Sequence, residues 1–279
     1  MTLRPFVAAV GLLGALAGPV ASQESGSYSL VLPGVEFSAC VQFLMEPEAA
    51  SKEVGRDFVP VPAVNFTPLS PVLQREVQGD ALHSAWIPAQ ICVIEAPTVS
   101  AGGRIITPEK KMGPRQVLGF WLIAAGRSEG TPRRDQWMQV ALWTNDWHVQ
   151  RATEAAFVPM STFDPSLEPV PESNRHSYEI RVGKTYLHWD GELVGRDSTD
   201  APRSTDLQLT FDGKRGIQWE GRLSAQTRWS RFLPGAFRVE GKDDLAEALK
   251  GSPIRMFGPM YWGGDARVDY VRYAPSGGS

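Results

Sequence analysis

The sequence predicts a mainly β fold, either an antiparallel barrel or a strongly curved β-sandwich, with two or three short helices. Short runs in which apolar and polar residues alternate recur along the chain and are separated by turn residues. Two of these runs are near copies of one β-hairpin, and both end in Trp-(Asp/Glu)-Gly-x-Leu. A third run, residues 136–143, is apolar on both faces, which is typical of a strand covered on both sides.

The twin hairpins occupy residues 178–193 and 207–223. Side chains alternate across a strand, so one face of each copy is apolar and the other is polar. The apolar faces carry the indoles of Trp189 and Trp219, which we expect to be buried. The glycine after the acidic residue of each copy predicts a β-bulge or a close backbone approach.

The first half of the chain predicts a mixture of strands and helices. Pro and Gly residues separate the apolar segments, and Ser70-Pro71 has the residue types of a helix start. Expected strands are residues 28–32, 38–44, 86–94, 116–125 and 136–143, and expected helices are residues 46–54 and 70–79.

The run at 136–143 divides its apolar residues between two faces. By simple alternation, one face holds Met138, Val140 and Leu142, and the other holds Trp137, Ala141 and Trp143. Such a strand either lies between two layers or lines an apolar interior.

The second half reads as nearly all β. Residues 146–158 suit a strand or a helix equally well. Four prolines in 159–173 indicate a linker or a long crossing loop, so a boundary within 159–175 is an alternative to one domain over 23–279. Strands are expected at 236–240 and 266–273. A capping box starting at Asp244 predicts a helix at 244–250.

The N-terminus has the pattern of a secretory signal peptide, residues 1–22. Arg4 precedes a short apolar run, and small residues end at Ser22. We therefore expect an exported protein, periplasmic or extracellular, without a membrane span once the signal is removed. Export compartments are oxidising, so Cys40 and Cys92, the two cysteines, predict one disulfide. Two buried thiols are the alternative.

Composition narrows the classes of partner. Of the 279 residues, 42% are hydrophobic and 21% are charged, which fits an ordinary folded protein. The net charge of −3 becomes −4 when the leader, with one Arg and no acid, is removed. This balance argues against nucleic acid as a partner. No motif indicates a cofactor.

Aromatic residues give the strongest indication of a binding site. The chain has nine Trp, and large rings line ligand cavities as well as cores. Trp121, Trp137 and Trp143 fall on neighbouring expected strands and are the candidate ligand-binding residues. Packing of these rings in an ordinary core is the alternative.

Three local patterns suggest catalysis, and each also has a structural interpretation. Ser128 is the centre of a Gly-x-Ser-x-Gly sequence, but strand-like residues follow where a nucleophile elbow needs a helix. Lys110 and Lys111 are adjacent, and a Lys beside a second cation can form a Schiff base; a solvated turn is the alternative.

The third pattern is a mirrored pair of triplets, Asp146-Trp147-His148 and His188-Trp189-Asp190. If both triplets were strands that lay side by side, two imidazoles and two carboxylates would converge as an acid–base set or a transition-metal site. The alternative is that Trp-acid-Gly only shapes the fold, because the second hairpin has no His at the same place.

These observations favour an exported β-rich protein that binds a small, partly apolar ligand in an aromatic-lined cavity. A secreted hydrolase or carbohydrate-active enzyme is the second hypothesis. A structural or interaction protein of the cell envelope is the third.

Overall fold

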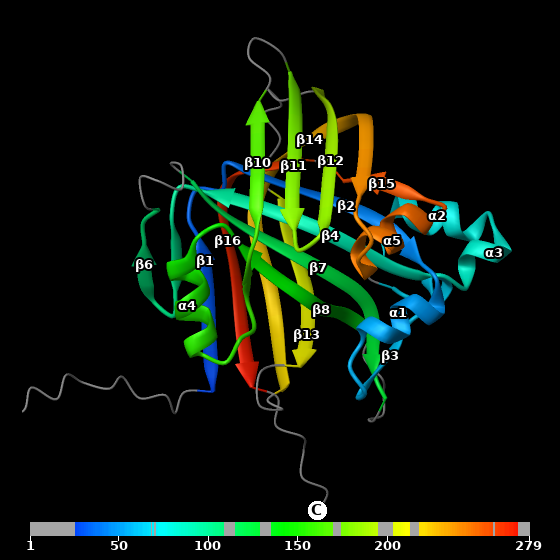
Figure 1. Ribbon diagram of the computed structural model, residues 1–279, viewed down its shortest axis with the longest axis horizontal. Helices are drawn as coiled ribbons and strands as arrows, with labels where there is room; N and C mark the ends of the chain where they lie inside the picture. Colours follow the sequence, from blue (N-terminus) through cyan, green and yellow to red (C-terminus); the bar gives the residue numbers. More distant parts are fainter. Residues whose placement is uncertain are drawn as a thin grey trace, which may run out of the picture.

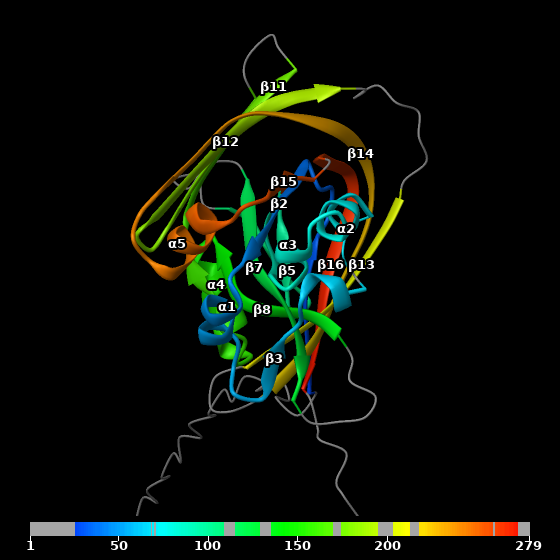
Figure 2. The same cartoon turned by 90° about the vertical axis from the view of Figure 1, so that its right-hand side faces the viewer.

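The protein is mainly β, with 16 strands, five α-helices and one 3-10 helix in the part described by a computed structural model (Figures 1 and 2). The two or three helices expected from the sequence were too few. The predicted signal, residues 1–22, lies outside the described part. That part comprises residues 26–67, 69, 71–108, 115–128, 135–169, 174–194, 203–212, 218–258 and 260–272.

Four of the helices lie among the strands of the first half of the chain, and two lie in the second half. The strands are β1 (Ser27–Leu32), β2 (Phe37–Met45), β3 (Phe58–Pro60), β4 (Ile87–Ala96), β5 (Val99–Ala101), β6 (Arg104–Ile106), β7 (Gln116–Arg127), β8 (Asp135–Thr144), β9 (Ser161–Thr162), β10 (Asp164–Pro169), β11 (Arg175–Val182), β12 (Thr185–Val194), β13 (Arg203–Asp212), β14 (Gln218–Glu240), β15 (Arg255–Phe257) and β16 (Met260–Arg272). The helices are α1 (Pro47–Glu53), η1 (Ala63–Asn65), α2 (Pro71–Gln78), α3 (Ala81–Ser84), α4 (Trp147–Ala155) and α5 (Asp244–Gly251).

The strands form one large, strongly curved sheet. Its order is β10-β11-β12-β14-β13-β8-β7-β4-β2-β16-β1-β5-β6, and β14 also pairs with β16. The β14–β16 pairing curls the sheet back on itself, but β16 meets β2 through a single described pair, Tyr261 with Ser38. The sheet is therefore curved without being a closed barrel, and the barrel alternative was wrong.

The sheet is also mixed, because β13 and β9 each pair with β8 in parallel. The sheet was expected to be mainly antiparallel, and these two parallel pairs are the exceptions. Strand β13 is distant from β8 along the chain, and helix α4 separates β8 from β9, so neither pair is joined by a tight turn that the sequence could signal.

Strand β14 joins two layers because its two halves have different partners. Its first half pairs with β13 and β16, whereas residues 231–240 pair with β12. Strands β10, β11 and β12, together with this end of β14, form a second layer that crosses in front of β2, β4 and β7 (Figure 1). Phe37 of β2 stacks on Tyr178 of β11 with ring centroids 4.6 Å apart. We call the face of β2 that carries Phe37 the outer face and the opposite one the inner face.

Both twin hairpins are present, as predicted, in β11–β12 and β13–β14. Trp189 and Trp219 are only 1% and 2% exposed. Gly183 provides the positive φ of the first turn. The turn of the second hairpin lies outside the described residues.

One expected face assignment was wrong. The β7–β8 register shifts between Trp121 and Leu122, which leaves Val140 as an extra residue in β8. As a result Trp137 pairs with Ala124 on the inner face, whereas Trp143 pairs with Gly119 on the outer face. Simple alternation across 136–143 fails because a bulge resets the side-chain period.

Other differences from the expected elements are local. Helix α4 lies within the ambiguous residues 146–158, and its start is fixed by Asp146, whose Oδ1 accepts the His148 N–H. The segment expected as a crossing loop contains strands β9 and β10. Despite its prolines, it pairs with β8 through β9 and with β11 through β10. The strand expected at 236–240 is the end of β14.

Candidate functional site

The inner face of the curved sheet encloses a small cavity of about 50 Å³. Strands β2 and β4 form one wall, and β13, β14 and β16 form the other. The lining side chains are aliphatic, apart from two hydroxyls and the disulfide: Val35, Ser38, Cys40, Cys92, Ile94, Leu207, Leu223, Ala225, Thr227 and Ala266.

The disulfide predicted from the sequence is confirmed. Cys40 and Cys92 are directly opposite in β2 and β4, and their Cα atoms are 4.1 Å apart. The pair ties together the two strands that make one wall of the cavity. With a sequence separation of 52 between the cysteines, the crosslink is expected to stabilise the fold by about 3–4 kcal/mol.

Thr227 gives the cavity its polar character. This residue is 2% exposed, and its Oγ1 has no hydrogen-bond partner among the described residues. It lies where the β14–β16 register shifts, between Thr227 and Arg228. A buried hydroxyl without a partner costs about 1–3 kcal/mol, so a molecule that hydrogen-bonds to it would recover free energy.

The size of the cavity limits what can enter it. On a scale where one water needs about 10–15 Å³, the cavity has room for roughly three to five waters. A small organic molecule of about as many non-hydrogen atoms fits the same space. The walls favour an aliphatic body, and Thr227 favours a single polar group such as a carbonyl or a hydroxyl.

The three candidate tryptophans lie in packed layers. Trp137 contacts Phe66 edge-on at 4.8 Å on the inner face, and Trp143 lies beside Phe163 on the outer face. Trp121 is 6% exposed. None of the three lines the cavity described above, so their role in ligand binding stays a prediction.

Ser128 immediately follows β7, at the start of the connection to β8. Its hydroxyl and its N–H both donate to the carbonyl of Asp57, at 3.0 and 2.8 Å. The hydroxyl proton is therefore directed at a backbone oxygen and not at a base. Because β7 and β8 pair antiparallel, the strand-to-helix turn of a nucleophile elbow is absent from the described part of this connection.

The mirrored triplets do not converge. The Asp146 Oδ2 accepts from Gln116 Nε2 at 2.6 Å, and the carboxylate caps a helix, so this triplet is no strand. His148 therefore lies in α4, whereas His188 lies in β12. No three His, Cys, Asp or Glu side chains gather as metal ligands among the described residues, which include all four of this set. The described residues therefore give no support to a shared metal site, and the acid–base set stays a prediction.

His188 and Asp190 lie on the polar face of β12, as the alternation predicts. The imidazole lies 3.6 Å from Glu179 through Nδ1 and 4.0 Å from Asp190 through Nε2. Asp190 also accepts the N–H of Ala236 at 2.8 Å, which fixes it as a structural contact between β12 and β14.

Lys110 and Lys111 lie outside the described residues. The described chain resumes at Arg115, which donates to the buried Glu95 at 2.6 Å and pairs with Glu36 at 2.7 Å. Burial raises the pKa of Glu95, and the guanidinium of Arg115 opposes that shift. This acid–arginine cluster was not identified from the sequence. Its three members are far apart in the chain, and only the strand pairing brings them together.

Thr227 was also missed. Alternation along β14 indicates that it shares a face with Leu223 and Ala225, but the sequence does not show that the face encloses a cavity. Among the described residues, no helix combines the length and the apolar character needed to cross a membrane.

Comparison with known proteins gives no family assignment. No protein-family profile and no curated protein match the sequence. Among solved structures, an acetoacetate decarboxylase from Legionella pneumophila is similar with a TM-score of 0.46 and 9% identity, over 90% of this chain and 88% of that one. The enduracididine biosynthesis enzyme MppR gives a TM-score of 0.44 and 9% identity, over 91% and 89%. An acetoacetate decarboxylase-like enzyme from Sphingomonas wittichii gives 0.41 and 9%, over 95% and 97%.

Proposed function

We propose that this chain is an exported binding protein for a small, partly apolar molecule, held in the inner-face cavity. The observation that carries the proposal is the buried hydroxyl of Thr227, which has no partner among the described residues and lines a mostly apolar cavity. Buried polar groups normally have hydrogen-bond partners, so a buried hydroxyl without one in a cavity suggests that a ligand supplies the partner. Aliphatic residues and the disulfide line this cavity, and the tryptophans expected from the sequence lie elsewhere.

Export is part of the proposal and has independent support. Residues 1–22 have the order of a cleavable signal, and the Cys40–Cys92 disulfide suits an oxidising compartment. Expression with and without residues 1–22, followed by fractionation and N-terminal sequencing, tests it. An uncleaved protein retained in the cytoplasm would contradict export.

The binding experiment uses small carbonyl compounds and alcohols as probes. Saturation-transfer NMR with acetone, pyruvate and 2-butanol should show contact with the wild-type protein. Ala225→Leu fills the cavity and should abolish the signal. Thr227→Val keeps the shape but removes the hydroxyl, so binding should weaken about fivefold or more, as expected for one lost hydrogen bond.

Thr162→Val is the matched control, because Thr162 is exposed on β9 and does not line the cavity. Loss of an orphaned hydroxyl should not destabilise the fold, so Thr227→Val should keep the wild-type melting temperature or raise it. Equal binding by wild type, Thr227→Val and Ala225→Leu would overturn the proposal.

A further inference from the structure

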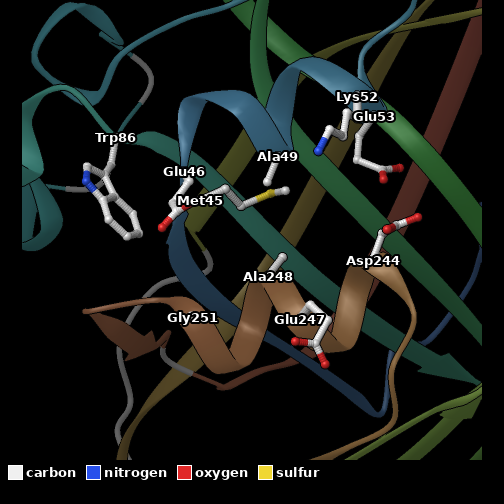
Figure 3. A pocket seen from close by; sticks show the side chains of 10 residues that line it. All are labelled: Met45, Glu46, Ala49, Lys52, Glu53, Trp86, Asp244, Glu247, Ala248 and Gly251. Atoms are coloured by element: carbon white, nitrogen blue, oxygen red, sulfur yellow. The ribbon is translucent and has the colours of Figure 1, made fainter.

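A second hollow, separate from the inner-face cavity, lies between helices α1 and α5 (Figure 3). Its volume is about 280 Å³, close to the lower end of the roughly 300–1,000 Å³ typical of small-molecule sites. Met45, Ala49 and Ala248 supply apolar surface, and Trp86 stands at one end.

The charges around this groove are unbalanced. Four carboxylates line it, together with one ammonium, that of Lys52. Lys52 already pairs with Glu48 at 3.3 Å, outside the lining set, and Glu247 pairs with Lys250 at 3.2 Å. Three carboxylates remain without an ion-pair partner in the described part of the chain: Glu46, Glu53 and Asp244.

Two of these carboxylates face one another. Glu53 descends from the end of α1 and Asp244 rises from the start of α5, so their charged ends approach across the groove (Figure 3). Burial raises the pKa of Glu53, and the negative charge of Asp244 raises it further. The two carboxylates therefore repel one another, and a cation placed between them would relieve that repulsion.

We propose that the α1–α5 groove binds a small organic cation, with its ammonium between Glu53 and Asp244 and its apolar body against Met45, Ala49 and Ala248. The indole of Trp86 offers a face for an aromatic or a second cationic group. Charge complementarity selects this occupant, because an anion would meet unpaired carboxylates and a neutral molecule would leave their repulsion in place.

The test compares three molecules of one shape by calorimetry at low salt. Phenethylammonium is the probe, 2-phenylethanol is its neutral analogue, and 3-phenylpropionate is an anionic analogue. Phenethylammonium should bind at least tenfold more tightly than the alcohol, and the anion should not bind. Added salt should weaken the cation alone. Equal binding of cation and alcohol would overturn the proposal.

Two substitutions locate the site. Glu53→Gln and Asp244→Asn should each weaken phenethylammonium about fivefold or more. Glu192→Gln removes one charge from the polar face of β12, away from the groove, and should change affinity less than twofold. Because Glu53→Gln removes a repulsion, the variant should be at least as stable as the wild type, so a loss of binding would not reflect unfolding. Equal effects of all three variants would also overturn the proposal.

The pH dependence has a defined sign. Cation binding needs ionised carboxylates, so affinity should fall as the pH is lowered through the raised pKa of Glu53. The other charged groups on the facing elements are Glu46 just before α1, Glu48 and Lys52 on α1, and Glu247 and Lys250 on α5. In Glu53→Gln the fall should shift to lower pH, and an unchanged profile would contradict the role of Glu53.

Discussion

The two hairpins end in the same Trp-(Asp/Glu)-Gly-x-Leu pattern but differ in their contacts with neighbouring strands. In both, an indole is buried on the apolar face. After Trp189, the register between β12 and β14 shifts, and a Cβ on Gly191 would lie 2.3 Å from the Phe232 ring. After Trp219, the β13–β14 register continues without a break through Gly221. The shared local pattern therefore specifies the hairpin, whereas the partner strand decides whether the register shifts at its glycine.

The acidic residues differ in the same way. Asp190 accepts the N–H of Ala236 and lies against Gly235, so it holds β14 where the register shifts. Glu220 is half exposed and reaches Arg127 only at 3.9 Å. The first hairpin therefore uses its acid to connect two strands, and the second has a weak surface ion pair in its place.

The largest expected effect tests what the two hairpins share. Trp189→Ala and Trp219→Ala should each lower the free energy of unfolding by about 3–5 kcal/mol, because both indoles are fully buried. Chemical denaturation at equilibrium measures both. A loss below about 1 kcal/mol for either variant would show that the equivalence of the two indoles is wrong.

Substitution of the two glycines should destabilise the protein to different extents. Gly191→Ala should cost about 2–3 kcal/mol, because the new Cβ would meet both the Phe232 ring and the Leu233 carbonyl oxygen, at 2.3 and 2.5 Å. Gly221→Ala should cost about 1 kcal/mol, since its closest contact is the Tyr270 ring at 3.0 Å. Thermal unfolding of the two variants gives the comparison, which fails if Gly221→Ala is the more damaging.

Substitution of the acidic residues, Asp190 and Glu220, should give the smallest difference in stability between the hairpins. Asp190→Ala should cost about 1 kcal/mol through the lost hydrogen bond to Ala236, whereas Asp190→Asn keeps an acceptor and should cost less. Glu220→Ala should change stability by less than about 0.5 kcal/mol. Amide exchange of Ala236 reports on the same contact, and unchanged protection in Asp190→Ala would contradict it.

Local patterns in the sequence predicted much of the fold. The hairpins, the burial of their indoles, the disulfide and helix α5 follow from alternation, turn residues and capping, which act over a few neighbouring residues. The bulge at Val140 broke the expected face assignment of Trp143, because a single extra residue reverses every side chain beyond it.

The candidate sites could not be predicted in the same way. Asp146 and His148 form a metal-like triplet only if the segment is a strand, and the capping carboxylate instead starts a helix. Thr227 and the Glu53–Asp244 pair carry no sequence motif. Each matters because of residues more than a hundred positions away, whose proximity no local pattern encodes.

The sequence by itself determined a β-rich chain with paired hairpins, one disulfide and inward-facing tryptophans, because side-chain alternation and turn chemistry are short-range. Only the tertiary structure decided that β14 spans two layers, that the sheet curls without closing, and that an apolar cavity and an acidic groove form in different places. The physical reason is that strand order and the contacts between layers depend on burial between distant segments, which local propensity leaves open.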